Sequence, residues 1–174
     1  MIYDIVQTQD KGKTLLGVAI LRRFISNGYY QPEEVYSNIV LTLPGCHIGT
    51  SEEIAESMVT MVEKRWKHKI FFLDEIDRLF PARWWNDKER THRLLGLWQD
   101  VKLFHRFIST RHATSGVDKL FRDAAQLIFV PNYMPERDLI DVDIINSLDA
   151  RVGGIIVPNA SKHFGCYLRW EPVY

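Results

Sequence analysis

A short apolar run, a polar loop that ends in Gly-Lys-Thr and a helical pattern follow one another at the start of the chain. The apolar run covers residues 2–6, the loop covers residues 7–12, and apolar positions at helical spacing continue through residues 13–26. Gly28 follows, where a glycine commonly ends a helix. A strand that leads directly into a helix favours an α/β fold with a mainly parallel central sheet flanked by helices.

The alternation of strands and helices continues along the chain. Four more apolar runs predict strands, at residues 38–43, 69–73, 103–109 and 126–130. A helix is predicted to begin after a cap at Thr50 or Ser51, because acidic residues in its first turn suit the helix dipole. This helix is predicted to run to about Lys67.

The last part of the chain departs from this alternation. Residues 135–149 predict an acidic helix or a turn-rich segment, and residues 154–158 and 165–170 predict a C-terminal β-hairpin. The whole chain, residues 1–174, has the length of one compact domain.

Charge and cysteine content restrict the setting in which the chain works. There are 22 Lys and Arg and 22 Asp and Glu residues, so a globally cationic nucleic-acid coat is excluded, although a local basic groove is not. Two cysteines 120 positions apart, Cys46 and Cys166, favour reduced thiols in a cytoplasmic compartment. No run of 18 apolar residues is present and the first residues lack the pattern of a signal peptide, so we expect no stable membrane insertion.

The loop before the first helix has the composition of a phosphate-binding loop. Its backbone N–H groups, with those of the helix start, would form an anion-binding concavity. Lys13 would reach the β- and γ-phosphates, and the Thr14 hydroxyl would coordinate Mg²⁺. The full phosphate-loop pattern, G-x-x-x-x-G-K-T, requires a glycine at position 7, where this chain has Gln7. The alternative is a surface turn before an ordinary helix.

A second motif lies 60 residues further on. The apolar strand 70–73 ends in Asp74-Glu75, and ligands of parallel sheets lie beyond the carboxyl ends of the strands. Asp74 is therefore predicted to hold Mg²⁺ beside the loop, and Glu75 to orient and deprotonate the water that attacks the γ-phosphate. The alternative for this motif alone is a solvated acidic turn.

Together these segments resemble a P-loop ATPase of the FtsK–HerA group, which includes DNA-pumping and genome-packaging ATPases, and the Zot-like phage proteins. The residues that carry the resemblance are Gly12-Lys13-Thr14, residues 71–75 (FFLDE) and residues 107–125 (FISTRHATSGVDKLFRDAA). The resemblance implies a RecA-like P-loop NTPase sheet with strand order 5-1-4-3-2, ATP and Mg²⁺ as cofactors, and activity as a homo-oligomeric ring.

The same resemblance extends the predicted site. Ser109-Thr110-Arg111 stands where the group usually has a Thr-Gln sensor. Because Arg111 replaces the glutamine, the resemblance does not identify the residue that senses the γ-phosphate. Arg111 and Arg122 are the candidates for a catalytic arginine, and the alternative for Arg122 is a surface pairing with Asp118 or Asp123. The predicted nucleotide-binding residues are Asp10, Lys11, Gly12, Lys13, Thr14 and Thr110.

AAA+ ATPases are the alternative family. Residues 71–83 (FFLDEIDRLFPAR) are very similar to the acidic motif of that family and the helix after it. However, AAA+ modules carry a separate helical lid after the core, and the 44 residues that follow residue 130 in this chain contain β-type runs in place of a helical pattern. The FtsK–HerA group is therefore placed first and AAA+ second.

The first assignment implies an ATP-hydrolysing motor that moves double-stranded DNA, with viral genome packaging as the most specific expectation. Its partners would be DNA, further copies of the chain and a capsid or portal-vertex protein, in the host cytoplasm or on the virion. Residues 63–69 and 102–112 combine basic and aromatic side chains, which suits a phosphate backbone but equally an exposed helix face and the flanks of a buried strand. The alternative function is a Zot-like assembly or export component with a weakly catalytic or structural role.

Overall fold

The computed structural model of the chain describes residues 1–64, 68–76, 105–112, 124–146 and 150–172. Its first half contains β1 (Ile2–Gln7), α1 (Lys13–Ser26), η1 (Pro32–Glu34), β2 (Val35–Ser37), β3 (Ile39–Leu41), β4 (His47–Ile48), α2 (Ser51–Glu63) and β5 (Ile70–Leu73). Its second half contains β6 (Arg106–His112), β7 (Leu127–Met134), η3 (Pro135–Arg137), β8 (Leu139–Ile145), β9 (Arg151–Pro158), η4 (Ala160–Cys166) and β10 (Tyr167–Pro172).

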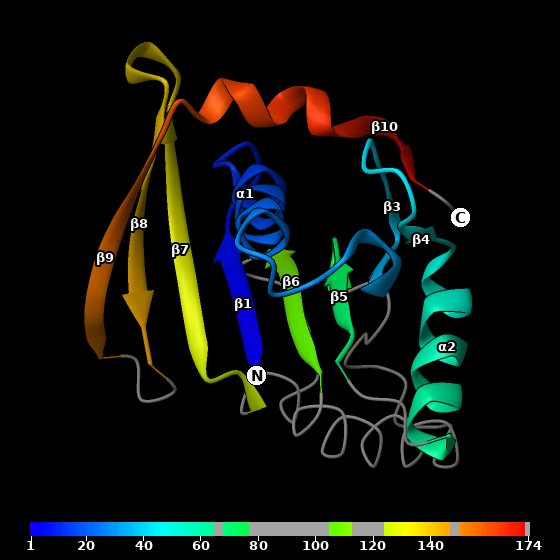
Figure 1. Cartoon of the computed structure of the whole chain (residues 1–174). Helices are drawn as coiled ribbons and strands as arrows, with labels where there is room; N and C mark the ends of the chain where they lie inside the picture. The colour runs from blue at the N-terminus through cyan, green and yellow to red at the C-terminus, as the bar shows by residue number, and fades with distance from the viewer. Residues whose placement is uncertain (65–67, 77–104, 113–123, 147–149, 173–174) are drawn as a thin grey trace.

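Eight of the described strands form one sheet, in the order β4-β2-β5-β6-β1-β7-β8-β9 (Figure 1). The strands from β4 to β7 are parallel, and β8 and β9 extend the sheet with antiparallel pairing. The part β7-β1-β6-β5-β2 has the order 5-1-4-3-2, so the predicted mainly parallel α/β sheet of the RecA-like type is confirmed.

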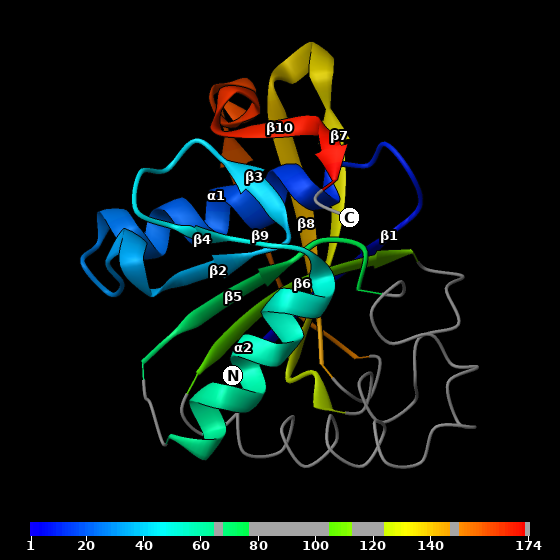
Figure 2. The same ribbon diagram turned by 90° about the vertical axis from the view of Figure 1, so that its right-hand side faces the viewer.

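The helices α1 and α2 cover opposite faces of the sheet (Figure 2). On one face, α1 packs against residues such as Ile5, Phe72 and Ile108. On the other face, α2 packs against their sequence neighbours, including Phe71 and Phe107. This division follows from the alternation of side chains along a strand, and it explains why β5 is apolar at every position.

The helix boundaries follow the sequence signals closely. The helix α1 covers residues 13–26 as predicted, and Gly28 then adopts φ +72°. Thr50 caps α2, since its hydroxyl accepts the Glu53 N–H at 3.1 Å while its own N–H donates to the Glu53 carboxylate at 2.7 Å. The helix ends at Glu63, earlier than the predicted Lys67.

The structure corrects three predictions about secondary structure. The strand expected over residues 38–43 forms only as β3, which pairs with β10 in a separate two-stranded sheet, whereas β2, just before it in the chain, joins the main sheet. Residues 135–149, expected to form an acidic helix or a turn-rich segment, contain the short helix η3 followed by strand β8. The expected C-terminal hairpin does not form, because β9 pairs with β8 and β10 pairs with β3.

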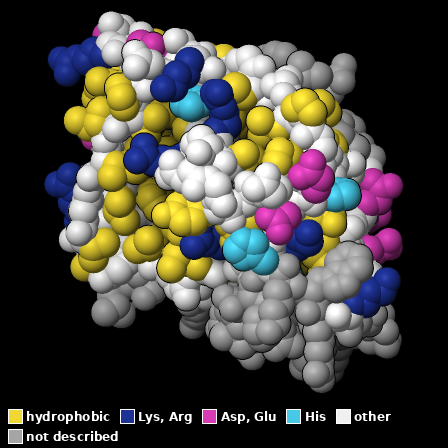
Figure 3. Space-filling model, viewed as in Figure 1, with side chains coloured by type: hydrophobic (Ala, Val, Ile, Leu, Met, Phe, Trp, Pro, Cys, Tyr) yellow, Lys and Arg dark blue, Asp and Glu magenta, His cyan; other side chains and the backbone are white. Residues whose placement is uncertain are grey.

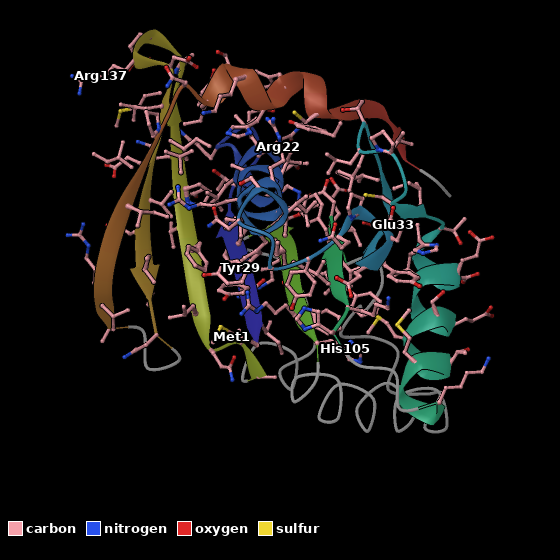
Figure 4. The ribbon with its side chains drawn as sticks, viewed as in Figure 1. Met1, Arg22, Tyr29, Glu33, His105 and Arg137 are labelled. Atoms are coloured by element: carbon pink, nitrogen blue, oxygen red, sulfur yellow. The ribbon has the colours of Figure 1, made fainter. Side chains whose placement is uncertain are left out.

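The segment η4 connects β9 to β10 and passes over α1 (Figures 1 and 4). Arg22 of α1 donates from Nη1 to Nδ1 of His163 at 3.1 Å, which anchors the middle of the segment. Its first turn is anchored by Asp138, whose carboxylate accepts the Ser161 N–H at 2.6 Å and the Ser161 hydroxyl at 2.8 Å. The segment η4 is therefore anchored to α1 through His163 and to Asp138 through Ser161.

Candidate functional site

The predicted phosphate loop lies between the end of β1 at Gln7 and the start of α1 at Lys13. Asp10 and Gly12 adopt left-handed φ values of +57° and +84°, which turn the chain from the strand into the helix. The Lys13 side chain is 8% exposed, and its Nζ donates to the Thr8 carbonyl at 2.8 Å. The ammonium group is thus directed back over the loop.

Gln7 occupies the position at which the standard pattern has glycine. Its side-chain carbonyl oxygen accepts the Thr8 N–H at 2.9 Å. The side chain therefore contributes to the start of the loop, and the loop still leads into α1 at the predicted residue.

Thr14, Asp74 and Thr110 form one hydrogen-bonded cluster beside the loop. The Thr14 hydroxyl lies 3.0 Å from Oδ1 and 3.2 Å from Oδ2 of Asp74, so it donates to that carboxylate. The Thr110 hydroxyl lies 2.5 Å from the same Oδ1. Three residues that are far apart in the sequence therefore meet, because α1, β5 and β6 all present an end at the same edge of the sheet.

Burial raises the pKa of Asp74, while the hydrogen bonds from Thr110 and Thr14 act in the opposite direction. A carboxylate that loses hydration in this way gains from a cation at the same place. The adjacent donors, a carboxylate and a hydroxyl, are the hard oxygen ligands that Mg²⁺ prefers. Among the described residues, no three His, Cys, Asp or Glu side chains gather as metal ligands.

Glu75 follows Asp74 with an unusual backbone conformation. Its φ is +51°, a left-handed value that is costly for a residue with a side chain. Its N–H donates to the Thr110 hydroxyl at 2.9 Å, which holds this turn at the end of β5. Thr110 therefore fixes both members of the acidic pair, through the Asp74 carboxylate and through the Glu75 backbone.

Asn38 is a member of the site that the sequence analysis did not identify. Its Nδ2 donates to the Asp74 carbonyl at 2.8 Å, and its Oδ1 accepts the Asp74 N–H at 2.7 Å. The Asn38 side chain thus makes the two hydrogen bonds to the Asp74 backbone that a neighbouring strand would otherwise make, at the point where the chain leaves β2. No motif marks this residue, and only the adjacency of β2 and β5 in the sheet would have indicated it.

Arg111 lies away from this cluster, on the other face of the sheet. Its Nε donates to Oδ2 of Asp4 at 2.7 Å, and both side chains are almost fully buried. Ser109 donates to the other Asp4 oxygen at 3.1 Å. Burial raises the pKa of Asp4, and Arg111 and Ser109 counteract that shift. Asp4 therefore holds the Arg111 side chain within the core, away from its predicted position at the phosphates. The other arginine candidate, Arg122, lies outside the described residues with Asp118 and Asp123.

A loop with a buried lysine at a helix start, beside a hydroxyl and a carboxylate at the end of a nearby strand, defines the class of P-loop nucleotide-binding proteins. Residues 8–127 match the family model of the ATPase family associated with various cellular activities (AAA). The match covers more than half of the chain, which therefore belongs to this family. It is the family that the sequence analysis placed second, and membership of the FtsK–HerA group stays a prediction.

Three solved structures with related folds are distant in sequence. The N-terminal domain of zonular occludens toxin from Neisseria meningitidis has a TM-score of 0.65 at 17% identity, over 96% of this chain and 98% of that one. A second solved structure, itself an ATPase domain, has a TM-score of 0.56 at 13% identity, over 98% and 84%. The flagellar accessory protein FlaH from Methanocaldococcus jannaschii has a TM-score of 0.53 at 14% identity, over 90% and 84%.

These similarities establish the fold. No curated protein matches the sequence significantly. Among the described residues, no helix combines the length and the apolar character needed to cross a membrane. Membership of the AAA family indicates nucleotide binding and nucleoside triphosphate hydrolysis as the general activity.

Proposed function

We propose that this chain is a Mg²⁺-dependent ATPase that works as a homo-oligomeric ring to move double-stranded DNA, in viral genome packaging. The observation that carries the ATPase assignment is the contact between Thr14 and Asp74, which joins the phosphate loop to the acidic motif. Residues 60 positions apart in the chain thereby form a single site.

Each residue of the site has a separate role in this proposal. Lys13 exchanges its bond to the Thr8 carbonyl for the β- and γ-phosphates, and the loop amides bind the same oxygens. Thr14 and Asp74 would hold Mg²⁺, which neutralises charge on the phosphates when it is bound. Glu75 accepts the proton of the attacking water, and Thr110 keeps Glu75 in position through its backbone.

The DNA assignment depends on the sequence resemblance and on one arrangement in the fold. The described parts of the two basic and aromatic segments are hydrogen-bonded to each other, since the Lys69 N–H donates to Nδ1 of His105 at 3.1 Å and the Arg106 N–H donates to the Lys69 carbonyl at 3.0 Å. The basic side chains of these parts that are at least partly exposed, Lys64, Lys69 and Arg106, suit a phosphate backbone, while Arg111 is buried in its ion pair with Asp4. In this proposal the protein acts in the host cytoplasm or on the virion, and a capsid or portal-vertex protein is a further partner.

The homo-oligomer is supported by the edge strand β9. Val152, Ile155 and Ile156 are 55%, 40% and 65% exposed, and in Figure 3 hydrophobic side chains gather on that side of the molecule. Among the described strands, β9 pairs only with β8. A long apolar edge strand of this kind is a template for pairing with another chain.

The ATPase assignment is tested by replacing Glu75. The variant Glu75→Gln should retain ATP binding and lose turnover by roughly a hundredfold or more, the effect of removing a positioned base. Glu136→Gln makes the same change at an exposed position and should leave turnover unchanged. Phosphate release in the presence of Mg²⁺ measures turnover. If Glu75→Gln hydrolyses ATP like the wild-type protein, the catalytic role of Glu75 is rejected.

A structural or weakly catalytic role is the second candidate, and Gln7 at the glycine position of the loop favours it. The two candidates differ in turnover and in its response to DNA. Hydrolysis that duplex DNA accelerates supports the motor. Tight ATP binding with negligible hydrolysis, with or without DNA, supports the structural role.

A further inference from the structure

Phe164 is an exposed aromatic side chain whose position the packing of the core does not explain. It is 39% exposed on η4. Its ring contacts the ring of Tyr133 edge to face, with 5.8 Å between the centroids and 74° between the planes. Only one other aromatic side chain among the described residues, Tyr29, is comparably large, apolar and exposed.

Tyr133 lies directly against the phosphate loop. A Cβ atom on Gly12 would lie 3.0 Å from Cβ of Tyr133, and the Tyr133 N–H donates to the Lys11 carbonyl at 3.3 Å. The aromatic pair of Tyr133 and Phe164 therefore begins at the loop and extends from it toward solvent. It lies on the side of the loop that faces β7, whereas Asp74 and Glu75 follow β5 on the other side.

The backbone that carries Phe164 is held in place on either side of the contact. Before it, the Ala160 N–H donates to the Asp138 carbonyl at 2.9 Å, and Asp138 also binds Ser161. Next to it, His163 is buried and contacts Arg22 of α1. After it, the Thr42 hydroxyl donates to the Gly165 carbonyl at 3.0 Å. The exposed ring is thus positioned before any ligand arrives, which limits the ordering cost of binding.

We propose that the exposed face of Phe164, supported by Tyr133, is the stacking platform for the base of a nucleotide whose phosphates bind at the loop. This inference rests on the proposed nucleotide site. Stacking uses the π-face that every base has, so it discriminates weakly between bases. The platform therefore accepts ATP and GTP with similar affinity, and binds the smaller pyrimidine rings of CTP and UTP less tightly.

The test separates base binding from phosphate binding. The dissociation constants of Mg²⁺-ATP and of inorganic tripolyphosphate are measured by calorimetry for the wild-type chain and for Phe164→Ala. Loss of one stacked base is expected to weaken ATP binding about tenfold or more. Binding of tripolyphosphate, which has no base, should not change. Phe164→Trp keeps an aromatic face and should restore ATP binding.

Two further variants make the outcome unambiguous. Tyr29→Ala removes the other exposed aromatic ring, at the opposite end of α1 from the loop, and should not affect ATP binding. Lys13→Ala should weaken ATP and tripolyphosphate together, because it acts on the phosphates. If Lys13→Ala has no effect on either ligand, the proposed nucleotide site itself fails.

The platform is rejected on its own if Phe164→Ala binds ATP as the wild-type chain does, or if it weakens ATP and tripolyphosphate equally. It is also rejected if Phe164→Trp behaves like Phe164→Ala, since a merely structural role of the phenylalanine would give that result. In each of these cases a normal response to Lys13→Ala leaves the proposed ATPase function standing.

Discussion

Thr110 and Arg111 are sequence neighbours whose side chains leave β6 on opposite faces of the sheet. Thr110 binds Asp74 on the face that α1 covers, and Arg111 binds Asp4 on the other face. The ion pair is buried, so its two charges depend on each other to offset the cost of desolvation. Arg111 is therefore a structural residue at a position next to the site.

Removing Arg111 should be more harmful than removing both charges. Arg111→Met leaves the Asp4 carboxylate buried without its cation, and a broken pair of this kind costs about 3–5 kcal/mol of unfolding free energy. The double variant Arg111→Met with Asp4→Asn removes the unpaired charge and should recover part of that loss. Urea unfolding at pH 7 measures both values. A double variant that is less stable than the single one would contradict this account.

At the residue scale, the sequence predicted the side chains that motifs define and missed those that the fold alone defines. Thr14 and Asp74 come into contact as their spacing and strand context suggested, and the Lys13 side chain lies over the same loop. The partner of Arg111 could not be predicted, because Asp4 lies 107 positions away and nothing in either local pattern connects them. The same is true of Asn38, whose contacts depend on β2 lying beside β5.

At the scale of elements, α1 lies unusually close to the sheet at Gly17. A Cβ atom at this position would lie 2.5 Å from Cε2 and 2.8 Å from Cζ of the Phe72 ring. Phe72 is fully buried, so the ring has little room to move. The glycine therefore sets the distance between the helix that begins at the phosphate loop and β5, the strand that precedes Asp74.

Gly17→Ala should destabilise the protein although alanine is the better helix former. Alanine gains about 1 kcal/mol over glycine in a helix, whereas overpacking a core costs about 1–3 kcal/mol. We expect a lower midpoint of urea unfolding and weaker ATP binding, because the loop shifts with the helix. Arg23→Ala, at an exposed position of α1, is the control and should change stability by less than about 0.5 kcal/mol. An increase in stability for Gly17→Ala would show that Phe72 yields easily.

Elements were predictable where one period dominates the sequence. The helix α1 has a clear apolar stripe, and β5 is a continuous apolar run. The residues of β8, Leu-Ile-Asp-Val-Asp-Ile-Ile, alternate apolar and acidic side chains, which is typical of a half-exposed strand, but their acidic content suggested an acidic helix or a turn-rich segment. The break between β2 and β3 follows from Asn38, which binds the Asp74 backbone and redirects the chain.

For the whole molecule, the proposed contact between copies of the chain uses the edge strand β9. The double variant Ile155→Lys with Ile156→Lys places two charges on the exposed edge, where they oppose strand pairing. We expect a shift from oligomer to monomer, measured by light scattering after size exclusion. Glu56→Lys gives the same change in net charge on the exposed side of α2 and should leave the assembly intact. If the lysine variant stays oligomeric, the contact between copies lies elsewhere.

The pairing of β10 with β3 has a consequence for how the chain acquires its structure. Residues 167–172 complete the small sheet that β3 begins, and Ala160 and Tyr167 are buried in the same core as α1. When synthesis has reached only β9, α1 and β3 have therefore been made, but the segments that cover them, η4 and β10, have not. Joining segments so distant in sequence is intrinsically slow, so the nascent protein exposes this apolar surface until residues 160–172 have emerged.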